Sequence, residues 1–504
     1  MFKSFHGYHI VENYHEWKLA HRKNKNPLNV KVLKIGFAII CALLLMFLDP
    51  ALYGMPGINP IEQRVAGVFI FAALMWLLEP VPAWTTSLVV VVVLLFATSN
   101  SAFLFLQKAA DGVKYDNLVK NVDILHCFAD PTIMLFIGGF ILAIAATKSG
   151  LDVKLAKVLL APFGTKSENV LFGFLLVTAL FSMFMSNTAT AAMMLTFLAP
   201  VLRDLPADGK GKIGLALAIP VGANIGGIGT PIGTPPNTIA MKYLNDPEGM
   251  DMGIGFGSWM LVMVPLVIVL LVIAWYVLKT LFPFKQKTIN LTIEDHHESG
   301  WRNYVVYVTF AITILLWVSD QFTGINANVV AMLPVGVLCV TGVITKRDLE
   351  EISWSILWMI AGAFSLGVAL QQSGLGADMI AAIPFDTWSP IMIIIGSGLT
   401  CWLMANFISH TATAALFMPI LALAGASMST QLEPLGGVST LLIGVALSSS
   451  LAMLLPISTP PNALADATGF IPQKQMLRTG IIMGVVGLSL GYIVLVLSGV
   501  YGIF

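Results

Sequence analysis

Largely apolar segments of 17 or more residues recur along this chain, and most polar residues lie between them. Met260–Leu278 and Ile481–Leu497 are two examples. An α-helix of this length crosses the apolar part of a bilayer. The segments lack the alternation of polar and apolar residues that a membrane β-strand shows. The pattern therefore predicts an all-α polytopic membrane protein.

The hydrophobic pattern divides the chain into about eleven transmembrane spans and two shorter, re-entrant hairpins. The spans lie near residues 35–49, 62–79, 84–98, 131–150, 212–242, 256–282, 301–319, 327–345, 353–374, 437–470 and 478–503. The hairpins lie at residues 168–202 and 389–425.

Composition supports this class of protein. Of 504 residues, 57% are hydrophobic and 11% are charged, and the net charge is zero. The charged fraction is less than half of the roughly 25% usual for soluble domains. A neutral chain has no bulk attraction to nucleic acid, so the expected partners are the lipid bilayer and a small solute. No His-Glu metal motif or Ser/His/Asp set is found, so we expect no enzyme and no bound cofactor.

Positively charged residues predict the orientation. If residues 1–34 form a cytoplasmic N-terminal segment, most lysines and arginines fall in predicted inside loops, as the positive-inside rule requires. Lys242 and the loop at 99–130 are the exceptions. The opposite orientation would invert nearly every loop. We therefore expect a multi-pass protein of the cell membrane with its C-terminus outside.

Two heptads are each written twice. Ser-Asn-Thr-Ala-Thr-Ala-Ala at 186–192 returns as Ser-His-Thr-Ala-Thr-Ala-Ala at 409–415, and Pro-Ile-Gly-Thr-Pro-Pro-Asn at 231–237 returns as Pro-Ile-Ser-Thr-Pro-Pro-Asn at 456–462. An odd number of predicted spans separates the copies, so they enter from opposite faces. The pattern predicts inverted repeats at 35–300 and 301–504, which is typical of transporters with a substrate site between the repeats.

The second heptad breaks a predicted span with two prolines. Proline has no N–H to pair with the carbonyl four residues earlier, and an unpaired carbonyl in hydrocarbon costs on the order of several kcal/mol. Such breaks persist where they line a cavity, meet an ion or are buried in protein; two simple kinks are the less favoured interpretation. The prolines are Pro235, Pro236, Pro460 and Pro461, and the freed carbonyls are those of Pro231, Ile232, Pro456 and Ile457.

The first heptad predicts a helix that begins at a hairpin tip, because Ser186 and Ser409 are good N-caps. A helix N-terminus presents free N–H groups and partial positive charge, which suit an anion. Two tips that meet from opposite faces could each hold one carboxylate. The alternative is helix packing without a ligand. His410 is the ionisable side chain predicted near the midplane at a tip.

These motifs resemble the divalent anion/sodium symporter family, the INDY group of dicarboxylate carriers. Its members carry Ser-Asn-Thr motifs at two hairpin tips, each followed by a proline-rich break. The resemblance extends from about residue 35 to the end. Residues 449–462 also resemble a C-terminal signature of the family, although Met453 stands where that signature prefers Phe.

The resemblance implies a homodimer that works by an elevator mechanism. A scaffold would comprise residues 35–150 and 301–374, and a moving transport domain would comprise residues 165–282 and 389–504. The implied substrate-binding residues are Ser186, Asn187, Thr188, Thr234, Ser409, His410, Thr411, Thr459 and Pro460. The implied sodium site comprises Ser186, Asn187 and Gly229, and an equivalent second site would lie at Ser409, His410 and the backbone near Ser458.

His410 departs from the family pattern because it replaces the second Asn. An imidazole is a poor ligand for sodium, and a cationic His410 could itself neutralise a dianion. A neutral hydrogen-bond donor is the other interpretation. We therefore expect a sodium-independent exchanger of C4 and C5 dicarboxylates such as succinate, malate, fumarate and 2-oxoglutarate. The alternative is a sodium-coupled dicarboxylate or citrate symporter, and an anion channel is a more distant hypothesis.

Overall fold

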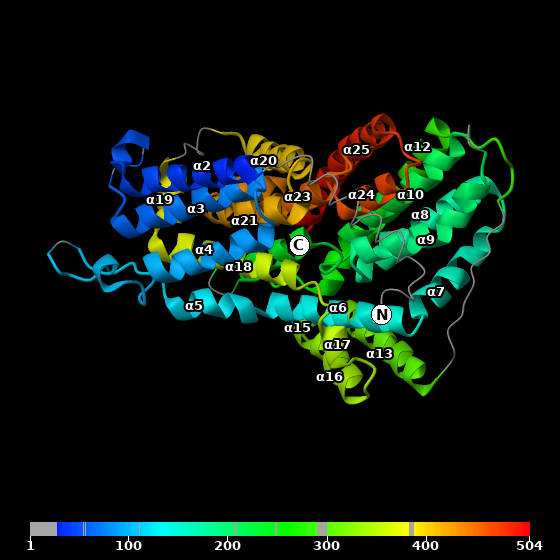
Figure 1. Cartoon of the computed structure of the whole chain (residues 1–504), viewed down its shortest axis with the longest axis horizontal. Helices are drawn as coiled ribbons and strands as arrows, with labels where there is room; N and C mark the ends of the chain where they lie inside the picture. Colours follow the sequence, from blue (N-terminus) through cyan, green and yellow to red (C-terminus); the bar gives the residue numbers. More distant parts are fainter. Residues whose placement is uncertain are drawn as a thin grey trace.

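The computed structural model describes residues 28–504 apart from 54, 56, 110, 207–208, 247–248, 290–299 and 383–387. The described residues form helices joined by loops, with three isolated β-bridges and no strand beyond them (Figure 1). The all-α prediction is therefore confirmed. Most of the predicted cytoplasmic segment 1–34 lies outside the described residues.

The first half of the chain follows the predicted order of elements. Its α-helices are α2 (Leu28–Phe47), α3 (Pro60–Leu78), α4 (Ala83–Ala97), α5 (Asn121–His126), α6 (Pro131–Lys148), α7 (Leu151–Leu160), α8 (Ser167–Phe184), α9 (Asn187–Asp204), α10 (Gly211–Gly226), α11 (Pro235–Leu244) and α12 (Phe256–Leu281). Its 3₁₀ helices are η2 (Pro50–Tyr53), η3 (Leu104–Leu106), η4 (Cys127–Ala129), η5 (Ala161–Phe163) and η6 (Gly227–Gly229).

The second half repeats this order with more short helices. Its α-helices are α13 (Trp301–Val318), α14 (Asp320–Thr323), α15 (Ala327–Val330), α16 (Met332–Val340), α17 (Lys346–Leu349), α18 (Trp354–Ser373), α19 (Leu375–Ala382), α20 (Pro390–Ala405), α21 (His410–Ser427), α22 (Ser429–Leu432), α23 (Gly437–Ser450), α24 (Pro460–Ala467) and α25 (Gln473–Val500). The 3₁₀ helix η8 (Glu433–Leu435) joins α22 to α23.

Among the described residues, ten helices are long and apolar enough to cross a membrane, or eleven if the bent pair Ser429–Leu435 and Gly437–Ser450 is one span. The total is close to the eleven predicted spans, but the predicted spans 84–98 and 327–345 correspond to the shorter apolar helices Ala83–Ala97 and Ala327–Val340. The hairpin arms α8 and α21 are among the ten. The re-entrant course of the hairpins therefore stays a prediction, although a hairpin of either kind returns the chain to the side it left.

Helix α2, at the first predicted span, starts earlier than expected. It begins at Leu28 rather than near residue 35, although it carries two lysines in its first turns. The amino group of Lys34 donates to the carbonyl of Leu78 at 2.9 Å, at the end of α3. A helix end leaves such carbonyls without helical partners, so this lysine is satisfied inside the helical segment.

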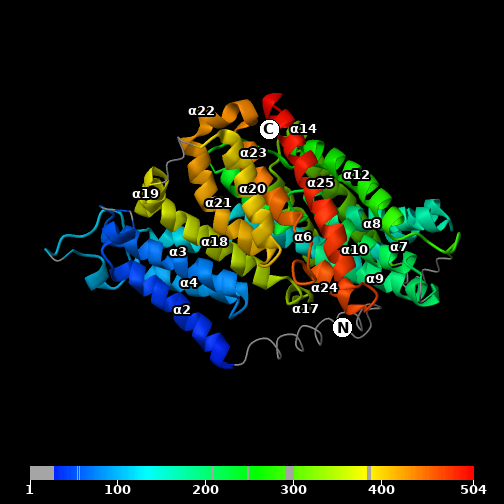
Figure 2. The same ribbon diagram turned by 90° about the horizontal axis from the view of Figure 1, so that it is seen from above.

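The two halves interlock where the repeated heptads lie. The short helix α11 of the first half packs against α21 and α23 of the second, and α24 of the second half packs against α9 and α10 of the first. Figure 2 shows α24 beside α9 and α10, with α25 and α12 alongside. This exchange of half-helices brings the two broken spans together.

Lys242, which lies in a predicted outside segment and is an exception to the positive-inside rule, forms an ion pair. Its amino group lies 3.0 Å from the carboxylate of Asp130, which also accepts a hydrogen bond from the N–H of Thr132 at the start of α6. The ion pair links α11 to α6. Because Asp130 neutralises Lys242, this exception to the positive-inside rule adds no net positive charge.

An ion pair between Lys148 and Asp348 joins α6 to α17. The two charged groups are 2.6 Å apart, and Asp348 also accepts hydrogen bonds from the N–H and hydroxyl of Thr345. Burial raises the pKa of Asp348, but the hydrogen bonds from Lys148 and Thr345 outweigh it and leave the pKa below its ordinary value. A carboxyl whose pKa is lowered by folding stabilises the folded state above its unfolded pKa.

We expect Asp348→Asn to lower the stability of the detergent-purified protein by about 2 kcal/mol at neutral pH. The difference from the wild type should persist above about pH 4, the ordinary pKa range of Asp, and shrink as the pH falls through the lower pKa of the folded protein. Thermal unfolding between pH 7 and pH 3 measures this. Asp116→Asn, at an exposed position, is the control. A pH-independent difference would contradict the assignment.

Candidate functional site

The first hairpin turns at Met185 and Ser186, and α9 starts at Asn187. Ser186 has extended backbone angles, and its hydroxyl accepts a hydrogen bond from the N–H of Ala189 at 3.1 Å. This is the predicted N-cap, and it leaves other N–H groups of the first turn without helical partners.

The second hairpin repeats this geometry. Ser409 caps α21 by accepting from the N–H of Ala412 at 3.1 Å. The adjacent His410 places Nε2 2.7 Å from the carbonyl oxygen of Ala452, which lies after α23. Because a carbonyl only accepts, Nε2 is the donor in this contact. His410 therefore ties the second hairpin to the second break, and both a neutral and a cationic imidazole can make this contact.

The first break separates η6 from α11. The prolines Pro235 and Pro236 occupy the first turn of α11, where no intrahelical N–H is needed. The hydroxyl of Thr238 donates to the freed carbonyl of Pro231. Asn237 donates through Nδ2 to the carbonyls of Gly227 at 3.0 Å and Thr230 at 2.8 Å. The Pro231 carbonyl is thus buried in protein and satisfied by a side chain of α11, which is one of the three surroundings expected for a freed carbonyl.

The second break, between α23 and α24, is held in the same way. Asn462 donates through Nδ2 to the carbonyls of Met453 at 2.9 Å and Leu455 at 3.0 Å. Its backbone N–H donates to the hydroxyl of Thr459, the N-cap of α24, at 3.1 Å. Sequence reasoning missed the role of the two asparagines, although both close the repeated heptad.

The first hairpin contacts the first break through Asn187. The hydroxyl of Ser182 on α8 donates to Oδ1 of Asn187. A Cβ built on Gly227 would lie 2.9 Å from both amide atoms of Asn187, so no side chain fits between the hairpin tip and η6. The hydroxyl of Thr230 donates to the carbonyl of Met183, which adds a second contact between the first break and the end of α8. Asn187 and the glycine loop thus form one oxygen-rich cluster.

The two breaks also contact each other directly. Nδ2 of Asn224, near the end of α10, lies 3.3 Å from the hydroxyl of Thr459 and 3.2 Å from Oδ1 of Asn462. Residues from both halves of the chain therefore meet at the candidate site.

The model of the sodium:sulfate symporter transmembrane region matches residues 31–504. The chain belongs to this family. The resemblance to divalent anion/sodium symporters is thereby confirmed over nearly the whole described structure.

Two relatives support the assignment. An uncharacterized transporter of Haemophilus influenzae is 31% identical over 392 residues, which cover 73% of this chain and 81% of the relative. The sodium-dependent dicarboxylate transporter SdcS of Staphylococcus aureus is 28% identical over 473 residues, 86% of each chain. Both relatives are transporters rather than enzymes.

The fold is similar to the crystal structure of the Alcanivorax borkumensis YdaH transporter. The TM-score is 0.55, and the alignment covers 86% of this chain and 98% of that chain at 11% sequence identity. At this identity the likeness concerns the fold alone.

The predicted site residues of this family member differ in exposure. The threonines Thr234, Thr411 and Thr459 are buried, and Pro460 is exposed. The residues at the two hairpin tips are half-buried, namely Ser186, Asn187, Thr188, Ser409 and His410. The tips and Pro460 are thus more accessible than the three buried threonines.

The cluster around Asn187 fits a hard cation by its donor set. Sodium prefers oxygen ligands, and the cluster offers Oδ1 of Asn187, the hydroxyl of Ser182 and backbone carbonyls of the glycine loop. Oδ1 of Asn237 is fully buried and has no hydrogen-bond partner among the described residues. Around His410 the donor set is poorer, because the imidazole occupies the position of an amide.

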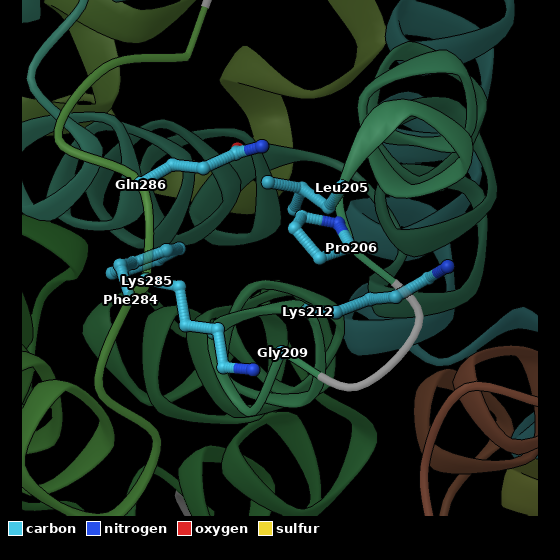
Figure 3. Close-up of a pocket in the computed structure, with 8 residues that line it drawn as sticks. Leu205, Pro206, Gly209, Lys212, Phe284, Lys285 and Gln286 are labelled. Atoms are coloured by element: carbon cyan, nitrogen blue, oxygen red, sulfur yellow. The ribbon is translucent and has the colours of Figure 1, made fainter.

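A separate pocket lies at the other end of α9 and α10 (Figure 3). Its walls come from the end of α9, the start of α10 and the segment after α12, and none of its residues belongs to the repeated heptads. The residues are Leu205, Pro206, Gly209, Gly211, Lys212, Phe284, Lys285 and Gln286.

Proposed function

We propose that this protein is a sodium-coupled transporter of C4 and C5 dicarboxylates. The observation that carries the proposal is the packing of Asn187, at a half-buried helix start, against Gly227 in the first break. The sodium-dependent dicarboxylate transporter SdcS, similar over 86% of each chain, supports the same assignment. The predicted sodium-independent exchange has no such support, and the sodium-coupled alternative fits the relatives better.

The substrate is proposed to bind between the hairpin tips. The free N–H groups at the start of α9 and α21 each suit one carboxylate, and the hydroxyls of Thr188 and Thr411 lie in the same first turns. Thr234, Thr459 and Pro460 at the starts of α11 and α24 complete the proposed pocket. Acceptor-only carboxylates match a site of N–H and O–H donors.

Sodium is proposed to bind at Ser186, Asn187 and Gly229, next to the Ser182 hydroxyl. A cation there would attract the dianion that binds at the same helix start, so each would raise the affinity for the other. His410 weakens the case for a second site of the same kind, because its Nε2 donates to the Ala452 carbonyl. The proposal therefore places the main coupling site in the first repeat.

Movement of this site is proposed to follow the elevator mechanism, in a homodimer with a cytoplasmic N-terminus and an external C-terminus. Residues 165–282 and 389–504 would move against the scaffold of residues 35–150 and 301–374. The exchange of half-helices between the repeats supports a common moving unit, since α11 packs on α21 and α24 on α9. A pair of cysteines, one at the position of Lys242 and one at the position of Asp130, would crosslink only while the two segments are in contact and would therefore report such movement.

Uptake by proteoliposomes tests the proposal. We expect succinate uptake to rise by at least about tenfold when an inward sodium gradient replaces choline, because the coupled ion raises substrate affinity. The substrate panel should include malate, 2-oxoglutarate, citrate and sulfate, the last because of the family to which the chain belongs. Protein-free liposomes are the control.

Other outcomes would select the alternatives. Equal uptake in choline together with stimulation by internal dicarboxylate would establish the sodium-independent exchanger. Currents well above carrier turnover, without stimulation by internal substrate, would establish an anion channel. Sodium-dependent sulfate uptake without dicarboxylate uptake would show that the substrate is sulfate rather than a dicarboxylate and that transport is still coupled to sodium.

A further inference from the structure

The amide of Asn224 links the two broken helices at a point that the predicted site does not include. Nδ2 of Asn224 lies 3.3 Å from Oγ1 of Thr459 and 3.2 Å from Oδ1 of Asn462. All three side chains are at most 3% exposed. Hydrogen bonds in such dry surroundings determine which way each group points.

The orientation of both amides follows from backbone carbonyls. Nδ2 of Asn462 faces the carbonyls of Met453 and Leu455, which accept hydrogen bonds and cannot donate them. Oδ1 of Asn462 must therefore face Asn224. Only a donor pairs with that oxygen, so Asn224 presents its NH₂ group to both Asn462 and Thr459.

This orientation assigns both lone pairs of the Thr459 hydroxyl. Oγ1 accepts one hydrogen bond from the backbone N–H of Asn462 at 3.1 Å and a second from Nδ2 of Asn224. A hydroxyl has two acceptor lone pairs and one O–H donor. Its remaining capacity is donation, and no acceptor for this O–H is found in the part of the chain that the structure describes.

We propose that Asn224 is a positioning residue that makes the Thr459 hydroxyl an obligatory donor to the substrate carboxylate. This inference rests on the proposed function, in which Thr459 lines the dicarboxylate site. Without the Asn224 amide, one lone pair of Oγ1 is free again, and the hydroxyl can rotate away from the substrate. Asn224 thus makes the second break selective for ligands that only accept hydrogen bonds.

A double-mutant cycle tests the proposal in proteoliposomes. We expect Asn224→Ala and Thr459→Val each to raise KM for succinate by about tenfold, the cost of one hydrogen bond to a charged group. The double variant should have the KM of Thr459→Val, because Asn224 acts through that hydroxyl. Measured at saturating succinate, the sodium concentration for half-maximal uptake should stay within twofold in all three variants, since the Asn224 amide donates to Thr459 and Asn462 and not to the Asn187 cluster.

Matched variants separate this effect from a loss of structure. Asn224→Asp keeps the shape of the side chain and removes its amide donors. It should therefore raise KM as Asn224→Ala does, and it takes the place of that variant if alanine impairs folding. Ser449→Ala is the control: residue 449 stands 225 positions after 224, the same offset as the second heptads, and its hydroxyl is buried without a partner among the described residues. Its KM should be that of the wild type.

Two results would overturn the inference, and they are distinguishable. If the wild type transports dicarboxylates and the two KM effects multiply, or if sodium affinity falls in parallel, Asn224 has a general structural role. If the wild type takes up no dicarboxylate in either sodium or choline, the proposed function itself fails, and the assignment of Asn224 fails with it.

Discussion

Replacing Asn237 with alanine is expected to destabilise the protein by about 2–5 kcal/mol and to reduce transport below detection. The Asn237 amide donates to the carbonyls of Gly227 and Thr230 in a fully buried position. Each buried carbonyl left without a donor costs about 1–3 kcal/mol. The same carbonyls shape the loop that packs against Asn187, so the sodium cluster is lost together with the break. Thermal unfolding in detergent and uptake by proteoliposomes measure the two effects.

Two variants check this expectation. Asn237→Asp has nearly the same shape but no amide donors at neutral pH, so it should be at least as damaging as alanine. Asn169→Ala, at an exposed position on α8, should leave both unfolding and uptake unchanged. Transport by Asn237→Ala at half the wild-type rate or more would show that the break does not depend on this amide.

Replacing Gly227 with alanine is expected to raise the sodium concentration for half-maximal uptake by at least about tenfold, the effect of weakening one strong ligand. The backbone of Gly227 has φ of −57°, which alanine adopts freely. The added Cβ would, however, lie 2.9 Å from the amide of Asn187 and must push that side chain out of the cluster. The Gly233 carbonyl oxygen would lie 3.1 Å from the same Cβ, so the backbone of the break must also shift slightly, and we expect a small loss of stability beside the loss of sodium affinity.

Contrasting glycines make this prediction specific. A Cβ at Gly226 would lie 2.3 Å from the Ala179 carbonyl oxygen, so Gly226→Ala should damage folding itself. Gly396 on α20 has open space around its Cβ position, and Gly396→Ala should leave sodium activation unaltered. If Gly227→Ala binds sodium like the wild type, the coupling ion does not bind at Asn187.

Local chemistry explains which parts of the site could be predicted. The helix starts at Asn187 and His410 coincide with the predicted hairpin tips because a serine N-cap acts within three residues of the chain. The breaks coincide with Pro235 and Pro460 because a missing N–H is a property of the residue itself. The preference for sodium-independent exchange rested on the single residue His410, and the relatives favour sodium coupling instead.

Contacts between distant segments could not be predicted. Asn224 meets Thr459 across 235 residues, and Lys242 meets Asp130 on a different helix. The freed Pro231 carbonyl was expected to line a cavity, meet an ion or be buried in protein, and the structure shows that the hydroxyl of Thr238, seven residues later, satisfies it. The pattern of polar residues shows that such groups need partners, but it does not show which partners are within reach.

By itself, the sequence determined that the chain is an all-α membrane protein, where the two hairpin helices start and two spans break, and that the same motif occurs in both halves. These properties follow from hydrophobic length, capping and the missing N–H of proline, all of which act over one or two helical turns. Only the tertiary structure decided that α11 packs on α21 and α24 on α9, and that Asn224 of the first half contacts Thr459 and Asn462 of the second. The physical reason is that hydrogen bonds between the repeats form after packing has excluded water, and packing depends on the whole chain.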